Sequence, residues 1–403
     1  MRWIEGREGE IVDVLSRLCQ VPAIGPESGG DGEGKKAHLL REILKGYGFR
    51  DIKDYPRKDS RIPDGVRPNI VTTLNGSDPS LGSVWIISHI DVVPPGETRL
   101  WKTDPYKPEV RNGKLYGRGV EDNGQAIAAS MFAAASLIAM ERKHRRDVKL
   151  AFVSEEETGS KYGIRHLIAE GHFKPDDLII VPDAGSPDGS QIEVVEKSHL
   201  QVKVKVTGRQ CHASRPHKGV NAYRVAASFV TEVVNALYSK YPDRDELFIP
   251  PYSTFEPTKK EANVPNINTI PGEDVSYMDF RILPTTPPED VLETVKKFAD
   301  MHSHESNARI DITDHNTSRA PPATPVDSPV VKALMRSIKE VSGVTPIPIG
   351  IGGGTCAAFF RKAGLPAIVW STSDETAHEP NEYVHVKNLV SDAKVYAHLF
   401  LSA

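Results

Sequence analysis

The segment Val148–Ser160, with the sequence VKLAFVSEEETGS, decides the fold class of this chain and locates its chemistry. It begins with a largely apolar run, of the kind that forms a buried strand in a parallel sheet. Three carboxylates, Glu155, Glu156 and Glu157, follow directly. Carboxylates at the mouth of a buried strand are costly unless a cation neutralises them. A pair of divalent metal ions would take one as a ligand and leave its neighbour as a base, and a solvated acidic turn is the alternative.

Two other segments are built in the same way. VWIISHID at Val84–Asp91 and LIIVPD at Leu178–Asp183 are apolar runs that end in metal-ligand residue types. Sites in open parallel sheets form beyond the carboxyl ends of the strands, so these three ends are expected to converge on one crevice. There His89 would offer a ring nitrogen, and Asp91 would hold that ring from behind. Alternation along the strand could instead place both residues on a solvent face.

A glycine-rich stretch, LYGRGVEDNG at Leu115–Gly124, precedes an Ala-rich apolar helix predicted over Gln125–Met140. Asp122 stands just before that helix, where it could be an ordinary N-cap. As a metal ligand it has a further property, because the two oxygens of a carboxylate can bridge ions about 3.5–4 Å apart. The stretch contains no phosphate-loop signature.

Length and composition narrow the classes of protein. A chain of 403 residues exceeds the usual size of one hydrophobic core, so two domains are expected. The net charge of −4 gives no reason to expect nucleic acid or a membrane surface as a partner. Three scattered cysteines do not form a disulfide framework or a Cys-x-x-Cys zinc site. The N-terminus lacks an apolar signal region and no run could span a bilayer, so a cytoplasmic protein is expected.

The order of the predicted elements indicates an inserted domain. Residues 1–197 alternate strands with helices, which is typical of a mostly parallel α/β sheet, and this pattern resumes over 319–403. Residues 198–318 follow the order βαββαβ of a ferredoxin-like sandwich, with a helix over Asn221–Tyr238 and two strands in Ile267–Ile282.

Taken in order, these segments resemble the M20 family of metallopeptidases and amidohydrolases over nearly the whole chain. The family includes acetylornithine deacetylase, succinyl-diaminopimelate desuccinylase, aminoacylase and glutamate carboxypeptidase. Any one motif is weak, whereas nine in the family's order are specific. They are SHIDVVP at 88–94, GRG at 117–119 with Glu121-Asp122, EETGS at 156–160, PDA at 182–184, HAS at 212–214, NTIPG at 268–272, DFR at 279–281, GGGT at 352–355 and HEPNE at 378–382.

The resemblance implies a discontinuous, zinc-peptidase-like catalytic domain of residues 1–197 and 319–403, with 198–318 as an inserted dimerisation lid. It implies two zinc ions per subunit, which cobalt or manganese could replace. Glu156 would be the general base, with Asp91 beside it; Gly159 sets this register, and a shift by one residue is the alternative. The implied ligands are His89, Asp122 and Asp183 for one ion, and Asp122, Glu157 and His378 for the other.

The resemblance also assigns residues to the substrate. His212 and Asn268 of the lid would reach a neighbouring active site in a homodimer, and Arg281 would grip a substrate carboxylate. The alternatives are a strand-edge histidine bonded to backbone and an intersubunit ion pair, respectively. The backbone of the Gly353-Gly354-Thr355 loop, before a predicted helix start, could bind an anion, more readily a substrate carboxylate than a phosphate.

The expected function is metal-dependent hydrolysis of an amide or peptide bond in an N-acyl-amino acid or short peptide with a free carboxylate. Many desuccinylases of the family carry arginines where this chain has EKSH at 196–199 and CAA at 356–358, which argues against an N-succinyl dicarboxylate. Succinyl-diaminopimelate desuccinylase is nevertheless the alternative. A non-catalytic metal-containing binding protein on the same fold is a second alternative, and it predicts a lost base or ligand.

Overall fold

The computed structural model describes every residue from Met1 to Ala403, and the chain forms two compact units. Unit 1 consists of Met1–Val194, Ala323–Ile349 and Thr355–Ala403, and unit 2 consists of Val195–Pro322 and Gly350–Gly354.

The short Gly350–Gly354 segment belongs to unit 2 because its first two residues form backbone hydrogen bonds with residues of that unit. The Gly350 N–H donates to the Leu247 carbonyl at 2.6 Å, and the Lys197 N–H donates to the Ile351 carbonyl at 2.9 Å. The division expected from the sequence, with residues 198–318 as the inserted domain, left this segment and residues 195–197 and 319–322 in the other part of the chain.

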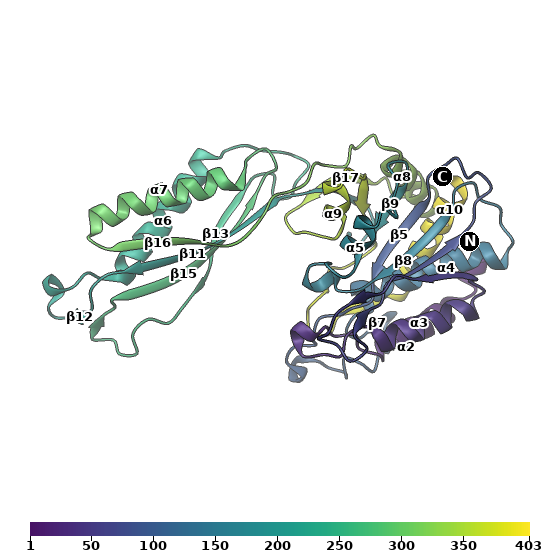
Figure 1. Cartoon of the computed structure of the whole chain (residues 1–403), viewed down its shortest axis with the longest axis horizontal. Coiled ribbons are helices and arrows are strands. Elements are labelled where there is room, and N and C mark those ends of the chain that lie inside the picture. The colour runs from purple at the N-terminus through teal and green to yellow at the C-terminus, as the bar shows by residue number, and fades with distance from the viewer. The chain divides into compact units, whose positions relative to one another are not determined.

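Unit 1 is built on a mixed sheet of eight strands in the order β1-β4-β8-β5-β9-β18-β10-β17 (Figure 1). The neighbouring strands β8, β5, β9 and β18 run parallel, whereas β1, β4 and β10 pair antiparallel. The predicted α/β fold is confirmed, with parallel pairing at the centre of the sheet. The strands are β1 Asp51–Asp54, β4 Ile70–Leu74, β5 Val84–His89, β8 Val148–Val153, β9 Leu178–Val181, β10 Gln191–Glu196, β17 Ile347–Ile351 and β18 Ala367–Val369.

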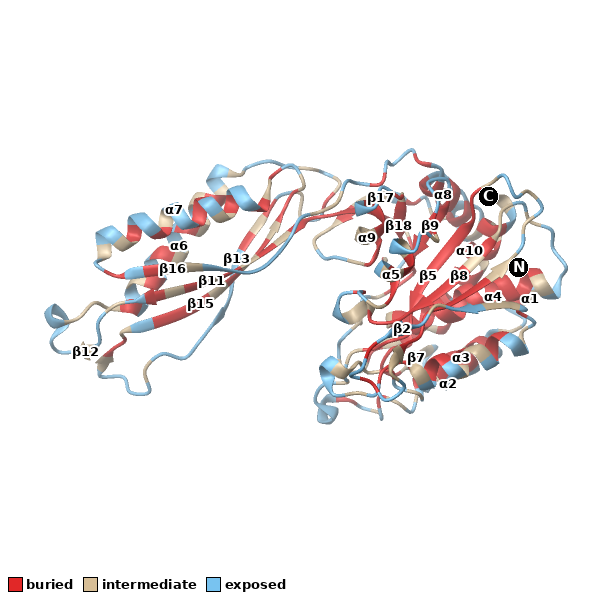
Figure 2. Cartoon of the chain, in the orientation of Figure 1, coloured by how far each residue is buried: buried red, intermediate tan, exposed pale blue.

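Helices cover both faces of this sheet, because its central strands bury apolar side chains on each side (Figure 2). On one face α4 packs against β5 and β8 and is covered by α2 and α10. It is buried along nearly its whole length, which explains why its sequence is apolar all round. On the other face α5 and α9 contribute Ile164, Leu167 and Phe360 to a core with alternate residues of the strands. The helices are α1 Arg2–Glu5, α2 Glu8–Cys19, α3 Gly34–Gly46, α4 Ala126–Ala139, α5 Ile164–Ala169, α8 Pro329–Ser342, α9 Ala357–Lys362 and α10 Val386–Ser402.

A small antiparallel sheet in unit 1 brings two distant segments together. Strand β7 (Lys114–Tyr116) lies between β6 (Glu109–Arg111) and β19 (Tyr383–His385), with Tyr116 opposite Tyr383. The chain that leaves β7 therefore runs beside the chain that enters β19. These are the glycine-rich stretch and the segment that ends in HEPNE. A further antiparallel pair joins β2 (Arg57–Lys58) and β3 (Val66–Arg67).

Unit 2 is a four-stranded antiparallel sheet in the order β13-β15-β11-β16 with two helices packed on one face (Figure 1). Residues along β11 alternate between buried and half-buried, as a sheet with one covered face requires. The chain order βαββαβ is that of a ferredoxin-like sandwich. Its elements are β11 Ser198–Thr207, α6 Ala222–Lys240, β13 Thr254–Lys260, β15 Glu273–Ile282, α7 Pro288–Ser306 and β16 Arg309–Ser318.

One strand of this motif differs from the expectation. The second strand is Thr254–Lys260, whereas the expected one near Ile267 is β14 (Thr269–Ile270), which pairs with β12 (Cys211–His212) outside the main sheet. Strand β13 has the sequence TFEPTKK and lies at an edge, where a proline and exposed lysines are tolerated. Such a strand lacks the apolar alternation by which strands are predicted.

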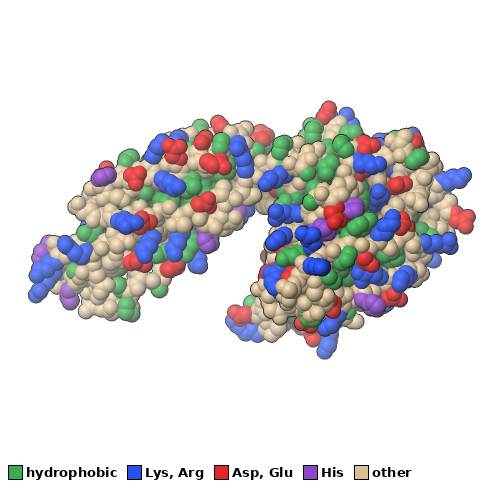
Figure 3. Space-filling view, in the orientation of Figure 1, with side chains coloured by type: hydrophobic (Ala, Val, Ile, Leu, Met, Phe, Trp, Pro, Cys, Tyr) green, Lys and Arg blue, Asp and Glu red, His purple; other side chains and the backbone are tan.

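The distribution of charge on the surface and the character of the helices complete the description of the fold. On the face drawn in Figure 3, basic and acidic side chains are interspersed over both units, in keeping with the net charge of −4. None of the helices combines the length and the apolar character that crossing a membrane requires.

Candidate metal centre

Three strand ends of the parallel part of the sheet lie at one edge of unit 1. Strand β5 ends at His89, the chain that leaves β9 reaches Asp183, and the chain that leaves β8 enters the acidic run Glu155–Glu157. Because β8, β5 and β9 are parallel neighbours, their carboxyl ends meet on the same side. Residues far apart in the sequence are thereby brought together.

Asp122 reaches this edge from the glycine-rich stretch and does not cap the helix that follows. Residues Val120–Gln125 form a wide turn before α4, with non-helical backbone at Asp122 (φ −111°, ψ 97°) and no side-chain capping bond. The turn is tied to the strand ends by Asn123, whose amide donates to Asp183 Oδ1 at 3.0 Å. The backbone N–H of His89 donates to the Oδ1 of the same amide at 3.3 Å. The N-cap alternative is therefore not adopted.

Five side chains form two groups that share Asp122. His89, Asp122 and Asp183 form one group and Asp122, Glu157 and His378 the other, with the potential ligand atoms of each within 4.8 Å of one another. The Nε2 of His89 lies 2.8 Å from Asp122 Oδ1 and 3.3 Å from Asp183 Oδ1. The Nε2 of His378 lies 3.1 Å from Asp122 Oδ2 and 3.0 Å from Glu157 Oε2. Each oxygen of Asp122 therefore faces a different histidine.

The spacing and the chemistry of these donors fit divalent metal ions. Ligand atoms about 2.1 Å from a tetrahedral zinc ion lie about 3.4 Å apart, which is slightly longer than the separations found here. Imidazole nitrogens and carboxylate oxygens are both zinc ligands. His89 also has the outer partner typical of a metal-bound imidazole, because its Nδ1 lies 3.1 Å from the Asp91 carbonyl oxygen. The five side chains could hold two cations that share Asp122.

Asp91 fixes the backbone of two members of the acidic run, Glu156 and Glu157. Its Oδ1 accepts the backbone N–H of Glu156 and its Oδ2 that of Glu157, both at 3.1 Å. Its carboxylate also lies 3.5 Å from the ring of His89. Glu156 belongs to neither group of ligands. Burial, reinforced by the charge of Asp183, raises the pKa of Glu156 well above its usual value.

Glu155 shapes the turn rather than joining the cluster. Its backbone lies in the left-handed region (φ +61°), and its carboxylate accepts the backbone N–H of Tyr162 at 2.6 Å. Gly159 continues the turn with φ +114°. This geometry presents Glu157, the third acid of the run, to the partners named above.

The histidines of the two groups favour the charged form. Hydrogen bonds to Asp122 and Glu157 raise the pKa of His378 to about 10. Burial opposes a charge on His89, yet hydrogen bonds to Asp122 and Asp183 raise its pKa well above the usual value. Burial likewise opposes ionisation of Asp122, but His378 and His89 hold its pKa below the ordinary range. A divalent cation must therefore displace protons in order to bind.

Two buried acids beside the ligands were missed from the sequence, where Glu121 and Glu382 were noted only as parts of motifs. Glu382 is fully buried and Glu121 is 9% exposed. Glu382 accepts the backbone N–H groups of Gly119 at 2.9 Å and Asp122 at 3.1 Å, and Arg118 donates to it at 2.6 Å. Burial raises the pKa of Glu382 to about 7, against the effect of Arg118. In the sequence, the only sign of a role for these acids is their position: Glu121 directly precedes the candidate ligand Asp122, and Glu382 ends the motif that begins with His378.

His212 and Asn268 are neighbours in unit 2. His212 ends β12 and Asn268 directly precedes its partner strand β14, and the Ala213 N–H donates to the Asn268 carbonyl at 2.9 Å. His212 is exposed, and its Nδ1 accepts the backbone N–H of Ser214 at 3.1 Å. This local bond uses only Nδ1, so Nε2 is the atom that could meet a substrate.

The guanidinium of Arg281 donates three hydrogen bonds to residues of unit 2. Its Nε donates to Asp279 Oδ1 at 2.6 Å, its Nη2 to Asp279 Oδ2 at 3.3 Å, and its Nη1 to the Gly352 carbonyl at 2.9 Å. These bonds place the guanidinium beside the loop that contains Gly353 and Gly354. Burial opposes ionisation of Asp279, but the hydrogen bonds from Arg281 lower the pKa of its carboxyl group to about 2.

Thr355 is assigned to unit 1, at the start of α9. Its Oγ1 accepts the backbone N–H of Ala357 at 3.2 Å, and α9 has only 6 residues. The predicted helix start is present, but the helix is too short to give a strong terminal dipole.

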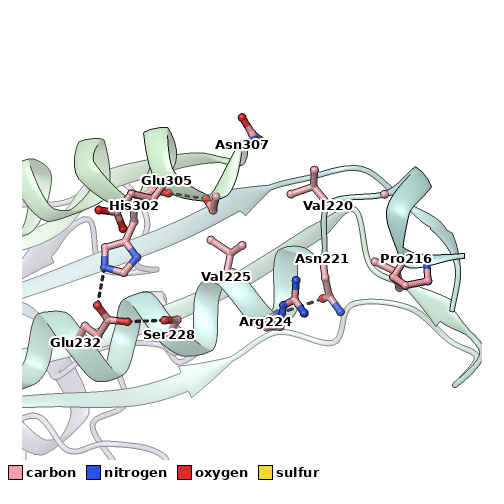
Figure 4. A pocket seen from close by; sticks show the side chains of 13 residues that line it. Pro216, Val220, Asn221, Arg224, Val225, Ser228, Glu232, His302, Glu305 and Asn307 are labelled. Atoms are coloured by element: carbon pink, nitrogen blue, oxygen red, sulfur yellow. Dashed lines mark hydrogen bonds and ion pairs between the residues drawn. The ribbon is translucent and has the colours of Figure 1, made fainter.

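A pocket of about 560 Å³ in unit 2 was not foreseen from the sequence (Figure 4). It opens between α6 and α7, where His302 Nε2 lies 3.2 Å from Glu232 Oε2 and Ser228 donates to Glu232 at 2.5 Å. His302 and Glu232 belong to neither group of clustered ligands. The pocket is therefore not the candidate for metal chemistry.

Comparison with known proteins agrees with the geometry. The model of peptidase family M20/M25/M40 matches residues 85–402. An uncharacterized metallohydrolase of Methanocaldococcus jannaschii is 39% identical, with 96% of this chain and 98% of that protein covered. The succinyl-diaminopimelate desuccinylase of Nautilia profundicola is 27% identical over 92% of this chain and 93% of that protein.

Two solved structures share the fold. Human carnosine dipeptidase 1 is 20% identical with a TM-score of 0.76, covering 99% of this chain and 97% of that one. The M20 metallo-carboxypeptidase Sso-CP2 of Sulfolobus solfataricus is 23% identical with a TM-score of 0.74, covering 97% and 99%. The chain belongs to peptidase family M20/M25/M40 and is a metal-dependent hydrolase.

Proposed function

We propose that this member of the M20 family hydrolyses an amide or peptide bond with two zinc ions. His89, Asp122 and Asp183 would hold one ion, and Asp122, Glu157 and His378 the other. The observation that carries the proposal is the position of Asp122, whose two oxygens lie 2.8 Å from His89 Nε2 and 3.1 Å from His378 Nε2. A carboxylate so placed can bridge two ions. Cobalt or manganese could substitute, because both accept nitrogen and oxygen ligands.

Glu156 would be the general base and acid. Bound metal supplies a water whose pKa is lowered to about 7 and polarises the substrate carbonyl. Glu156 would accept a proton from that water and deliver it to the departing amine. Three observations support this role: Glu156 adjoins the proposed ligands without being one, Asp91 fixes its backbone, and burial raises its pKa well above the usual value.

The carboxylate of the substrate would be bound by Arg281 with Gly353, Gly354 and Thr355. A guanidinium has five N–H groups, and Asp279 and the Gly352 carbonyl occupy three of them in a fixed orientation. The remaining two are available for a bidentate bond to a carboxylate. Arg281 would therefore be a pre-oriented anion receptor beside a glycine loop whose backbone can approach the ligand closely.

Unit 2 would be the dimerisation lid, and His212 and Asn268 would serve the active site of a partner subunit. Attack on an amide creates an oxyanion, which preplaced imidazole and amide donors stabilise. The exposed position of His212, with Nδ1 already bonded to Ser214, supports this role because it leaves Nε2 as a donor. Helix α6 and the edge strand β13 would form the two-fold contact.

The substrate class that we propose is the N-acyl-amino acids and short peptides with a free carboxylate. Relatives named as a desuccinylase and structural neighbours named as a dipeptidase and a carboxypeptidase bracket this class. Succinyl-diaminopimelate desuccinylase is the alternative activity. The proposal also includes a cytoplasmic location.

A substrate panel tests the proposed function. Acetyl-, succinyl- and aminoacyl-amino acids would be assayed with zinc, cobalt and manganese, each with and without a chelator. We expect chelator-sensitive release of an amino acid from at least one class, restored by added metal. Tight metal and ligand binding with no turnover across the panel would favour a non-catalytic binding protein instead.

A further inference from the structure

Two loops of unit 1 carry the ligands that the central sheet does not position directly. Asp122 lies on the loop after β7, and His378 lies on the loop of residues 370–382 between β18 and β19. The β7–β19 ladder joins the ends of these loops, with the Gly117 N–H donating to the Glu382 carbonyl at 3.0 Å. The ladder stops short of both ligands, so their separation depends on side chains.

Glu121 reaches across from the first loop to the second. Its Oε1 accepts Ser373 Oγ at 2.8 Å and the Asp374 N–H at 3.1 Å. Its Oε2 accepts Thr376 Oγ1 at 2.8 Å and also the Thr376 N–H. With 9% of the residue exposed, water cannot readily replace these bonds. A single carboxylate thus binds the segment that leads into His378 through four charge-assisted hydrogen bonds, which are stronger than neutral ones.

Glu382 reaches across in the opposite direction. It accepts the backbone N–H groups of Gly119, Glu121 and Asp122 at 2.9, 2.9 and 3.1 Å. The loop with His378 is therefore anchored on both sides of that residue, before it by Glu121 and after it by Glu382.

The backbone at His378 requires such anchoring. His378 has φ +64°, in the left-handed region that side chains with a Cβ disfavour. Its side chain is 55% exposed, so packing does not hold the ring in place. Residues with such backbone conformations persist where the surroundings over-determine them.

We infer that Glu121 is a positioning residue that sets the affinity of the second ion, the one to be held by Asp122, Glu157 and His378. This inference rests on the proposed two-metal function. All the side-chain partners of Glu121 lie on the loop of His378, and none lies on the strand ends that carry His89 and Asp183. Loss of an outer-shell partner typically weakens metal binding by about 10–100-fold. Here the loss should fall on one ion and spare the other.

The test compares Glu121→Gln with the matched control Glu375→Gln. Glutamine keeps the shape of Glu121 but turns an NH₂ group toward one pair of donors. Glu375 is an exposed glutamate on the same loop. Each change would be made in the full chain and in two single-site backgrounds, Asp183→Asn, which removes a ligand of the first ion, and Glu157→Gln, which removes one of the second. Zinc affinity would be measured by competition with a chromophoric chelator, and folding by thermal denaturation.

In the Asp183→Asn background, Glu121→Gln should weaken zinc binding by about 10–100-fold. In the Glu157→Gln background it should leave zinc binding unchanged, and Glu375→Gln should change neither. Ser373→Ala removes one donor and keeps the charge of Glu121, so it should weaken the same ion to a smaller extent. It also serves as the test if Glu121→Gln does not fold.

Three outcomes overturn the inference, and the last of them is distinguishable from the first two. If the unmodified chain binds two zinc ions and Glu121→Gln and Ser373→Ala bind both as tightly, Glu121 does not position the second ion. Equal weakening of both ions leads to the same conclusion, because the effect is then general. If the unmodified chain binds only one zinc ion, the proposed two-metal function itself fails.

Discussion

Asp91→Asn would test whether a single carboxylate positions both the proposed ligand Glu157 and the proposed base Glu156. Both oxygens of Asp91 are in use, one on the Glu156 N–H and one on the Glu157 N–H, each at 3.1 Å. Asparagine keeps the shape, but whichever way its amide turns, one of these N–H groups faces an NH₂. A buried N–H left without an acceptor costs about 1–3 kcal/mol. We expect the free energy of unfolding to fall by this amount.

The functional effect should be larger than the loss of stability suggests, because the disturbed groups are Glu157, a proposed metal ligand, and Glu156, the proposed base. We expect zinc affinity to fall by about 10–100-fold, as for other outer-shell partners. We also expect kcat to fall at saturating zinc, because Glu156 moves with its backbone. Zinc competition and initial rates over a range of zinc concentrations separate the two effects.

Asp177→Asn is the matched control. Asp177 is also buried and also accepts only N–H donors, from Ser83 at 2.6 Å, Trp85 Nε1 at 2.9 Å and Lys174 at 2.8 Å. It lies at the opposite end of β5 from His89, beside the first residues of β5 and β9. The Asp177→Asn change should lower the free energy of unfolding about as much as Asp91→Asn does, and it should leave zinc affinity and kcat unchanged. Equal zinc affinity and equal kcat in the two variants would refute the reasoning.

Three further predictions address the base, the lid and the core. Glu156→Gln should lower kcat by about 10²–10⁴-fold and retain the metal, and loss of metal in this variant would make Glu156 a ligand instead. Mixing inactive His212→Ala protein with inactive Glu156→Gln protein should restore some activity, because each heterodimer has one complete site; no recovery despite verified subunit exchange would place His212 in its own subunit's site or in a structural role. Burial raises the pKa of Asp392 from 3.8 to about 6, so between these values the folded chain binds more protons than the unfolded chain and stability falls as pH rises. Asp392→Asn can keep the bonds to Thr372 and Gln125 and should lack this pH dependence in urea unfolding at pH 4.5 and 7.5; the same dependence in both proteins would contradict the assignment.

The parts of the fold that follow from local patterns were predictable. The apolar strands that end at His89 and in the acidic run have lengths and compositions typical of a buried parallel sheet, and the geometry of parallel strands then brings their ends together. The edge strand Thr254–Lys260 was missed, because an edge position removes the requirement for apolar alternation. Asp122 remained ambiguous in the sequence, since a helix N-cap and a bridging ligand require the same residue type.

Glu121 and Glu382 could not be assigned from the sequence for a different reason. Glu382 acts on Asp122 from 260 residues away, and Glu121 acts on Thr376 from 255 residues away. No local pattern records such a pair, because three of the four groups that Glu382 binds and two of the four that Glu121 binds are backbone N–H groups, which every residue type except proline offers. What a sequence can show is the acid beside the motif, and only the fold shows what it binds.

The two groups of ligands therefore differ in how they are held. His89 is 2% exposed at the end of a central strand, and its two ring nitrogens face Asp122 and Asp91. His378 is 55% exposed, has a left-handed backbone and lies on a loop. A ligand on a buried strand is pre-organised by the core, whereas a ligand on an exposed loop must lose conformational freedom when it binds. The carboxylates of Glu121 and Glu382 reduce that loss, because they order the loop through bonds already present in the folded chain. This asymmetry is consistent with the position of Glu121 and Glu382, two buried acids that order the loop side of the centre.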